Sequence, residues 1–153
     1  MTRVLFLDVD GVLNYRALFK ARFDGPRLCS KAVARLRQVI ARTGAQTVLS
    51  STWRLDNAHM ALMRAGGFPC PHEDWRTIQV PVRFENGLVV FEPPYRGREI
   101  AEWLSRHPEV ERYAIVDDDD DMLPEQLPYF VKTSFDDGLL SEHVERLVEL
   151  LSP

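Results

Sequence analysis

The sequence predicts an α/β protein with a doubly wound parallel sheet in a three-layer α/β/α arrangement. Three observations predict this fold. Short apolar runs typical of buried strands recur along the chain, segments with helical periodicity separate them, and several runs end abruptly in acidic or hydroxyl side chains. Parallel strands are buried on both faces and are joined by helical crossovers, which accounts for both the runs and their spacing. We expect one domain over residues 1–153.

The first two strands and the helix between them are predicted from short stretches of sequence. Residues 4–7 (VLFL) and 46–50 (QTVLS) are apolar runs that we expect to form buried strands. The helix between them has Ser30 as its predicted N-cap, and Gly44 suits its end. Its apolar stripe comprises Ala32, Val33, Leu36, Val39 and Ile40.

A short helix and a hairpin are expected next. The helix would be capped by Asp56 or Asn57 and would end at Gly66-Gly67. Residues 77–91 differ from the preceding segments, because apolar and polar residues alternate there and Asn86-Gly87 supplies a two-residue turn. This segment therefore predicts a β-hairpin.

The second half of the chain returns to alternating helix and strand. A helix is expected around residues 97–106, followed by a strand at 113–116 that ends in five aspartates, 117–121. Residues 129–132 predict a peripheral strand, and a closing amphipathic helix begins at Ser141.

Composition narrows the class of protein. The chain is 45% hydrophobic and 27% charged, and its net charge of −4 argues against a protein that coats nucleic acid generally. No apolar stretch approaches the ~18 residues of a membrane span, and the first apolar run is too short for a signal peptide. We expect a cytoplasmic protein without a membrane or an obligate protein partner. Neither the two cysteines nor the four histidines have ligand spacing: Cys29, Cys70, His59, His72, His107 and His143.

The residues after the first strand are the most informative in the chain. Asp8 and Asp10 are costly to bury unless they are paired or bound to a metal. Gly11 allows the backbone to turn sharply and to approach a ligand closely. Open α/β sheets bind their ligands at the carboxyl ends of their strands, where these aspartates lie. A solvated DxDG turn is the alternative interpretation.

A second group of acids follows a later strand and is expected at the same sheet edge. Asp117 and Asp118 should therefore converge with Asp8 and Asp10. Two carboxylates ~4 Å apart repel by roughly 4 kcal/mol at an effective dielectric near 20, so protonation or a divalent cation is needed. Oxygen ligands with room for water and phosphate favour magnesium. A solvated loop is the alternative for the aspartate run.

Four segments resemble the motifs of the haloacid dehalogenase-like (HAD) hydrolase superfamily, and the resemblance spans essentially the whole chain. The resemblance implies a Rossmann-like fold with a minimal cap, in which residues of about 55–95 form a small hairpin and helix insertion. The four segments are LDVDGVLN at 7–14, TVLSSTWR at 47–54, RGREIAEWL at 96–104 and YAIVDDDDDM at 113–122.

The resemblance also implies roles for the acids. Asp8 would be the nucleophile that attacks phosphorus and becomes an aspartyl phosphate. Asp10 would protonate the leaving oxygen and then activate water. Mg²⁺ would be held by the Asp8 carboxylate, the Asp118 carboxylate and the backbone carbonyl of Asp10. Asp117 would support these ligands, and Asp121 would lie outside them.

Other parts of the predicted site bind the phosphoryl group and the substrate. Ser50 would donate to a phosphoryl oxygen, and Arg96, or alternatively Arg98, takes the place of the family's lysine. Guanidinium binds phosphate oxygens bidentately and stays charged. The predicted substrate-binding residues are Gly11, Ser51 and Arg54, with backbone amides near Val9 and Gly11 as further donors.

We therefore expect a magnesium-dependent phosphomonoesterase. The minimal cap suits large substrates, and SSTWR and RGREIAEWL resemble HAD domains of nucleic-acid repair proteins, which indicates nucleotides or polynucleotide ends rather than only a phosphorylated small molecule. A basic and aromatic segment at 15–27 favours this, although a solvated surface helix explains it equally. A receiver-like phosphoacceptor domain, with Lys132 as its lysine, and a catalytically silent binding module are the alternatives. The segment's basic and aromatic residues are Arg16, Lys20, Arg22, Arg27, Tyr15, Phe19 and Phe23.

Overall fold

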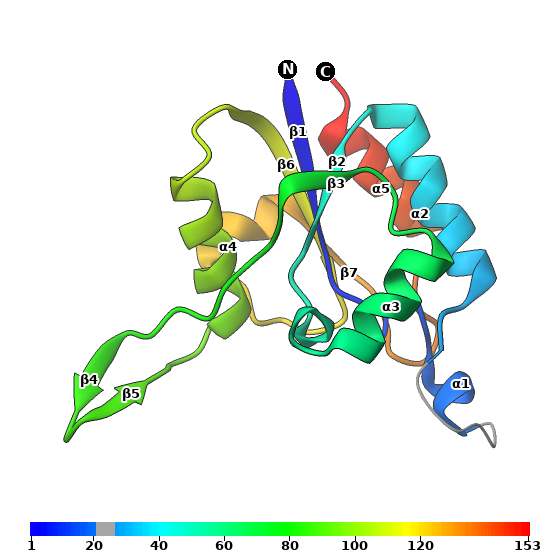
Figure 1. Cartoon of the computed structure of the whole chain (residues 1–153). Coiled ribbons are helices and arrows are strands. Elements are labelled where there is room, and N and C mark those ends of the chain that lie inside the picture. Colours follow the sequence, from blue (N-terminus) through cyan, green and yellow to red (C-terminus); the bar gives the residue numbers. More distant parts are fainter. Residues whose placement is uncertain (21–26) are drawn as a thin grey trace.

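The computed structural model describes residues 1–20 and 27–153. Its main sheet has the strand order β3-β2-β1-β6-β7, and every neighbouring pair is parallel. The predicted doubly wound parallel sheet is therefore confirmed (Figure 1). The strands are β1 (Thr2–Leu7), β2 (Gln46–Leu49), β3 (Pro71–Arg76), β6 (Val110–Asp117) and β7 (Phe130–Lys132).

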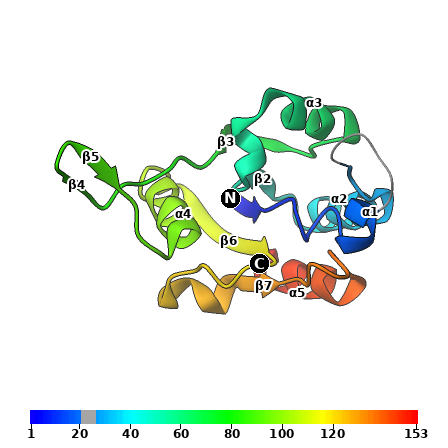
Figure 2. The same cartoon turned by 90° about the horizontal axis from the view of Figure 1, so that it is seen from below.

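The central strand β1 is buried on both faces and separates two hydrophobic cores. Its odd-numbered side chains, Leu5 and Leu7, belong to a core shared with helices α2 (Ser30–Thr43), α3 (Asn57–Gly66) and α5 (Ser141–Leu151). The even-numbered Val4 and Phe6 pack instead against α4 (Tyr95–Ser105). Figures 1 and 2 show α4 on one side of the sheet and the other three helices on the opposite side. This gives the three layers.

The helix ends follow local sequence signals, with one difference. Gly44 and Gly67 end α2 and α3 in the left-handed conformation, at φ values of 68° and 87°. Asp56 caps α3 by accepting the N–H of His59. The predicted N-cap of α2 was displaced by one residue, because Cys29 occupies the cap position without a side-chain hydrogen bond and Ser30 is already helical.

The predicted hairpin is present but shorter than expected. Strands β4 (Arg83–Glu85) and β5 (Leu88–Val90) pair antiparallel across Asn86-Gly87, whose φ values of 49° and 77° are typical of a tight two-residue turn. The alternating residues 78–82 lie outside β4, although the Val82 N–H still donates to the Val90 carbonyl of β5 at 2.8 Å. The hairpin projects away from the main sheet (Figures 1 and 2).

Strand β3 was not predicted. Its sequence, PHEDWR, is too polar for the pattern of a buried strand, and its residues are exposed or only partly buried. It nevertheless pairs with β2 and forms one edge of the sheet, while β7 forms the other edge as predicted. An edge strand is solvated on one side, which permits this composition.

The basic and aromatic segment of residues 15–27 lies only partly within the described residues. Arg22 and Phe23 fall outside them. Helix α1 (Arg16–Lys20) covers part of the rest, where Arg16 forms an ion pair with Asp136. The other short helices are η1 (Thr52–Leu55) and η2 (Pro124–Tyr129). Over the described residues, no helix has the length and apolar character needed to cross a membrane.

The order of the strands defines where a ligand would bind. From β1 the chain proceeds to β2 and β3 on one side, and then crosses to β6 on the other side of β1. This reversal leaves a crevice at the carboxyl ends of β1 and β6, the usual ligand position in such sheets. Asp8 follows β1 directly, and Asp117 ends β6.

Candidate active site

Three carboxylates meet at this crevice. One oxygen from each of Asp8, Asp117 and Asp118 lies within 4.8 Å of the others. The parallel register pairs Leu7 with Val116, and the Asp8 N–H donates to the Val116 carbonyl at 3.1 Å, so the following aspartates are adjacent. Asp8 is only 5% exposed and Asp117 only 2%. Asp8, Asp117 and Asp118 thus converge from opposite halves of the chain as predicted, whereas the fourth acid expected among them, Asp10, does not join the group.

Burial makes this cluster electrostatically unfavourable without a cation. Burial raises the pKa of Asp8 well above its usual value, and the negative charge of Asp117 raises it further. Burial also raises the pKa of Asp117 to about 6, although the N–H of Asp119 and the charge of Arg96 oppose the shift. One oxygen of Asp117, Oδ2, is buried and accepts no hydrogen bond. The all-oxygen donor set and this unsatisfied atom fit a hard divalent cation such as Mg²⁺.

Asp10 lies outside the carboxylate cluster. Its Oδ1 accepts hydrogen bonds from Nδ2 of Asn14 at 2.9 Å and from Nε1 of Trp53 at 3.1 Å. These two donors fix the orientation of the carboxylate beside the cluster. Trp53 is buried in the hydrophobic core, and its indole N–H also contacts the site.

Gly11 allows Asp118 to approach the first motif. Its φ of +77° is left-handed, and a Cβ at this position would lie 2.5 Å from Cγ of Asp118. Its N–H donates to Oδ1 of Asn14 at 2.8 Å. This amide, which was expected to bind substrate, is thus already bonded within the protein and would have to exchange partners to do so.

Arg96 is the cation that faces the cluster. Its Nε lies 3.4 Å from Oδ2 of Asp117, and its Nη2 lies 3.9 Å from Oδ1 of Asp8. Over residues 1–20 and 27–153, no carboxylate is within ion-pair distance of the alternative, Arg98. The geometry therefore favours Arg96 over Arg98 at this position.

The amino end of α4, which carries Arg96, is held by Asp121. The two carboxylate oxygens of Asp121 accept the N–H groups of Tyr95 and Arg96, each at 3.0 Å, and its carbonyl accepts that of Gly97 at 2.8 Å. A Cβ at Gly97 would lie 2.6 Å from the backbone N of Leu123, so only glycine permits this close approach. Asp121 therefore holds the backbone of Arg96 in place without itself joining the carboxylate cluster.

The two serines after β2 differ in their surroundings. The Ser50 N–H donates to the carbonyl of Leu7, which places Ser50 beside the first motif. Its hydroxyl is buried and has no hydrogen-bond partner. Buried polar groups without a partner are uncommon and often indicate a ligand. The hydroxyl of Ser51 accepts the N–H of Trp53 at 3.1 Å and caps η1, so its observed role is local.

Arg54 is occupied by contacts within the protein. Its Nη1 donates to the carbonyls of Ser50 and Ser51, both at 3.0 Å, and its Nη2 pairs with Glu99 at 3.1 Å. Glu99 also lies 3.6 Å from Arg96 and accepts the hydroxyl of Thr77 at 3.4 Å. Burial lowers the pKa of Arg54 and raises that of Glu99. Glu99, which the sequence analysis did not identify, thus links the two arginines.

A hollow of about 350 Å³ adjoins Arg96. Two aromatic side chains at its rim, Phe91 and Tyr95, are 40% and 49% exposed. The acids that line it are already engaged by α4 and by the two arginines. Its lining consists of Thr52, Arg54, Gln79, Phe91, Tyr95, Arg96, Glu99 and Asp121.

The fold also brings together two histidines whose spacing in sequence gave no signal. Ligand atoms of His72, His107 and Glu109 lie within 4.8 Å of one another. Both rings have other partners: Nδ1 of His107 is 2.7 Å from the Trp103 carbonyl, and Nδ1 of His72 accepts the N–H of Asp74. The group depends on β3, which the sequence did not predict, so its assembly could not be foreseen.

Comparison with known protein families identifies this architecture. Residues 4–144 match the family described as the HAD domain in Swiss Army Knife RNA repair proteins. The chain belongs to this family. The resemblance to HAD domains of nucleic-acid repair proteins is thereby confirmed, and membership supports a hydrolase-type enzyme. The match includes β1, β2, α4 and β6, the elements that form the candidate site. No curated protein and no solved structure gives a significant match.

Proposed function

We propose that the protein is a magnesium-dependent phosphomonoesterase that works through an aspartyl phosphate on Asp8 and acts on nucleotides or polynucleotide ends. The observation that supports this best is the buried cluster of Asp8, Asp117 and Asp118 with Arg96 facing it. It lies at the sheet crevice of a HAD-type hydrolase domain. A nucleophilic carboxylate divides phosphate ester hydrolysis into two easier steps.

The two steps use Asp8 and Asp10 in sequence. A carboxylate oxygen of Asp8 forms a bond to phosphorus while the ester oxygen departs with a proton from Asp10. Asp10 then accepts a proton from water, whose oxygen attacks the phosphorus, releases phosphate and restores the Asp8 carboxylate. The hydrogen bonds from Asn14 and Trp53 orient Asp10 for both transfers.

Charge stabilisation would come from several groups around the phosphoryl oxygens. Asp8, Asp118 and the Asp10 carbonyl would hold Mg²⁺, which neutralises negative charge on the transferring group when it is bound. The guanidinium of Arg96 provides a fixed positive charge beside Asp8. The free hydroxyl of Ser50 can donate to a phosphoryl oxygen, which would satisfy it.

The substrate class is proposed from the family and from the hollow beside Arg96. The matching family occurs in RNA repair proteins. A leaving group that departs past Arg96 would enter this hollow, where Phe91 and Tyr95 expose aromatic rings. Aromatic rings stack on nucleobases without requiring a particular sequence.

The structure gives less support to a receiver-like domain. Lys132, which would have to serve as its lysine, is 51% exposed and pairs with Asp120 at 2.9 Å. Asp120 is not among the three acids that converge. No observation favours a catalytically silent module: Asp8, Asp117 and Asp118 converge, and the Asp10 carboxylate is held beside them by Asn14.

The test is hydrolysis of an aryl phosphate with Mg²⁺ and after chelation. We expect turnover that chelation removes and that Asp8→Asn abolishes. Asp119→Asn is the matched control, since Asp119 belongs to the same acidic run but is exposed. Unchanged turnover by Asp8→Asn would refute the mechanism. A panel of nucleotides, phosphorylated oligonucleotides and sugar phosphates tests the substrate class. The proposed class is wrong if sugar phosphates are hydrolysed at the same rate as the nucleotides and oligonucleotides.

A further inference from the structure

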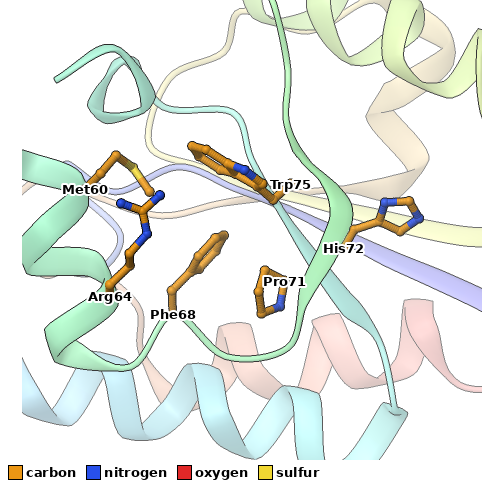
Figure 3. Close-up of a pocket in the computed structure, with 6 residues that line it drawn as sticks. All are labelled: Met60, Arg64, Phe68, Pro71, His72 and Trp75. Carbon is orange, nitrogen blue, oxygen red and sulfur yellow. The ribbon is translucent and has the colours of Figure 1, made fainter. Parts of the chain in front are cut away.

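We propose that the hollow between α3 and β3 binds a nucleobase of a single-stranded RNA substrate, at a distance from the phosphorylated end. The assignment of RNA as the substrate rests on the proposed function. The hollow, drawn in Figure 3, has a volume of about 250 Å³, and its lining includes none of the three clustered aspartates. Its lining residues come from α3, from the loop that follows it and from β3: Met60, Arg64, Phe68, Pro71, His72 and Trp75.

Two aromatic rings form walls of this hollow. Trp75 and Phe68 are both only partly buried, and their rings meet at 80° with centroids 6.4 Å apart. Figure 3 shows both rings beside Pro71, with the guanidinium of Arg64 near Met60. The other two tryptophans of the chain, Trp53 and Trp103, are 2% and 0% exposed. Trp75 is therefore the one tryptophan whose ring a ligand can reach.

The charge around Trp75 fits a polyanion. The guanidinium carbons of Arg64 and Arg76 lie 5.8 and 5.1 Å from the centroid of its ring. Both arginines are exposed, and no carboxylate of the described residues lies within ion-pair distance of either. A partly exposed aromatic ring with two guanidinium groups over it, neither paired with a carboxylate of the described residues, is a combination by which proteins bind single-stranded nucleic acid. An apolar ligand would leave both charges unused.

The position of the hollow suits the same substrate. Arg76 pairs in register with Leu49, the residue before Ser50, so Trp75 lies near the carboxyl edge of the sheet. β3 is two strands from β1, which corresponds to about 10 Å at ~4.8 Å per strand. Thr77 then bonds Glu99, which contacts Arg96. An RNA chain that extends from the phosphate site past Arg76 would place one of its bases at Trp75.

Fluorescence tests this without any hydrolysis. An unphosphorylated RNA hexamer should quench tryptophan emission, since Trp75 is the accessible indole. Trp75→Phe should lose the quenching yet still bind a labelled hexamer, because a ring remains for stacking. A hexaglutamate peptide serves as a polyanion without bases. Absence of quenching by RNA, or equal quenching by the peptide, would overturn the proposal.

Turnover tests the link to catalysis. RNAs of one to six nucleotides, each with one terminal phosphate, should show a KM that falls about tenfold once the chain reaches Trp75, the effect expected for one stacked base. Trp75→Ala should remove this preference and Arg64→Gln should weaken it. Phe84→Ala, which changes a 73% exposed ring on the hairpin, should retain it. If Trp75→Ala instead raises KM equally for one and six nucleotides, the pocket proposal is refuted. Quenching without turnover of any phosphate ester would refute the phosphatase and support the pocket.

Discussion

Gly11 gives a sharp test of the metal site, because a second glycine controls for its backbone strain. Gly11 and Gly87 both have a φ of +77°, so alanine at either position is strained in the left-handed region. That strain costs about 1 kcal/mol. A Cβ at Gly87 meets nothing within 4 Å, whereas a Cβ at Gly11 lies 2.5 Å from Cγ of Asp118. Only Gly11→Ala therefore displaces an acid of the cluster.

The size of that displacement sets the expected effect. An ordinary contact of 3.4 Å requires the Asp118 carboxyl carbon to move by about 0.9 Å. Mg²⁺ demands near-ideal octahedral geometry, so a ligand shifted this far is lost or distorted. We expect the Mg²⁺ affinity of Gly11→Ala to fall by roughly 10- to 100-fold, the range seen when groups that orient metal ligands are mutated.

Calorimetric titration with Mg²⁺ and thermal unfolding without metal measure the two effects separately. Gly87→Ala should lose about 1 kcal/mol of unfolding free energy, a shift in Tm of roughly 2–4 °C, and keep the wild-type Mg²⁺ affinity. Gly11→Ala should lose at least as much unfolding free energy as Gly87→Ala, and it should also bind Mg²⁺ more weakly. If Gly11→Ala binds Mg²⁺ like the wild type, Asp118 is not a ligand in the way proposed.

Three further predictions follow from buried groups. The pKa of Asp117 in the folded protein, about 6, exceeds its reference value of 3.8, so the unfolding free energy without metal should fall as pH rises from 4 to 6. The affinity for Mg²⁺ should rise through pH 6, because the cation binds the ionised carboxylate. Equal Mg²⁺ affinities in titrations at pH 5, 6 and 7 would contradict this. Asp121→Ala should lower kcat severalfold at unchanged Mg²⁺ affinity, because it frees the turn that holds Arg96; an affinity loss would make Asp121 a ligand instead. Arg54→Ala should cost about 3 kcal/mol in urea unfolding, because the buried Glu99 loses its shorter ion pair and keeps only Arg96, at 3.6 Å, as a charged partner. The exposed pair tested by Arg42→Ala should cost under about 1 kcal/mol, and equal losses would refute the buried pairing.

The main sheet and the acid cluster were predictable because their signals are local. An apolar run that ends in aspartate identifies both a buried strand and the edge at which its acids lie. β1 and β6 each show this signal, and their parallel pairing brings Asp8 and Asp117 together. The hairpin turn at Asn86-Gly87 was equally explicit, since few residues adopt its backbone angles.

The remaining features depend on contacts between distant segments. β3 has no apolar run because it is an edge strand with one solvated side, so its sequence resembles a loop. Without β3, neither the hollow at Trp75 nor the contact of Thr77 with Glu99 could be expected. Ser51 and Arg54 were predicted to bind substrate from their place in a motif, but the structure shows that both bond nearby backbone groups.

The five aspartates of residues 117–121 are identical in sequence, yet the structure places them in several different environments. Asp117 and Asp118 belong to the cluster, Asp120 pairs with Lys132, and Asp121 caps α4. Losing a single codon from this homopolymer would barely alter composition or charge. It would nevertheless shift every later aspartate into its neighbour's position and pull the cap away from the helix. The length of this run is therefore as important to the site as the identity of its residues.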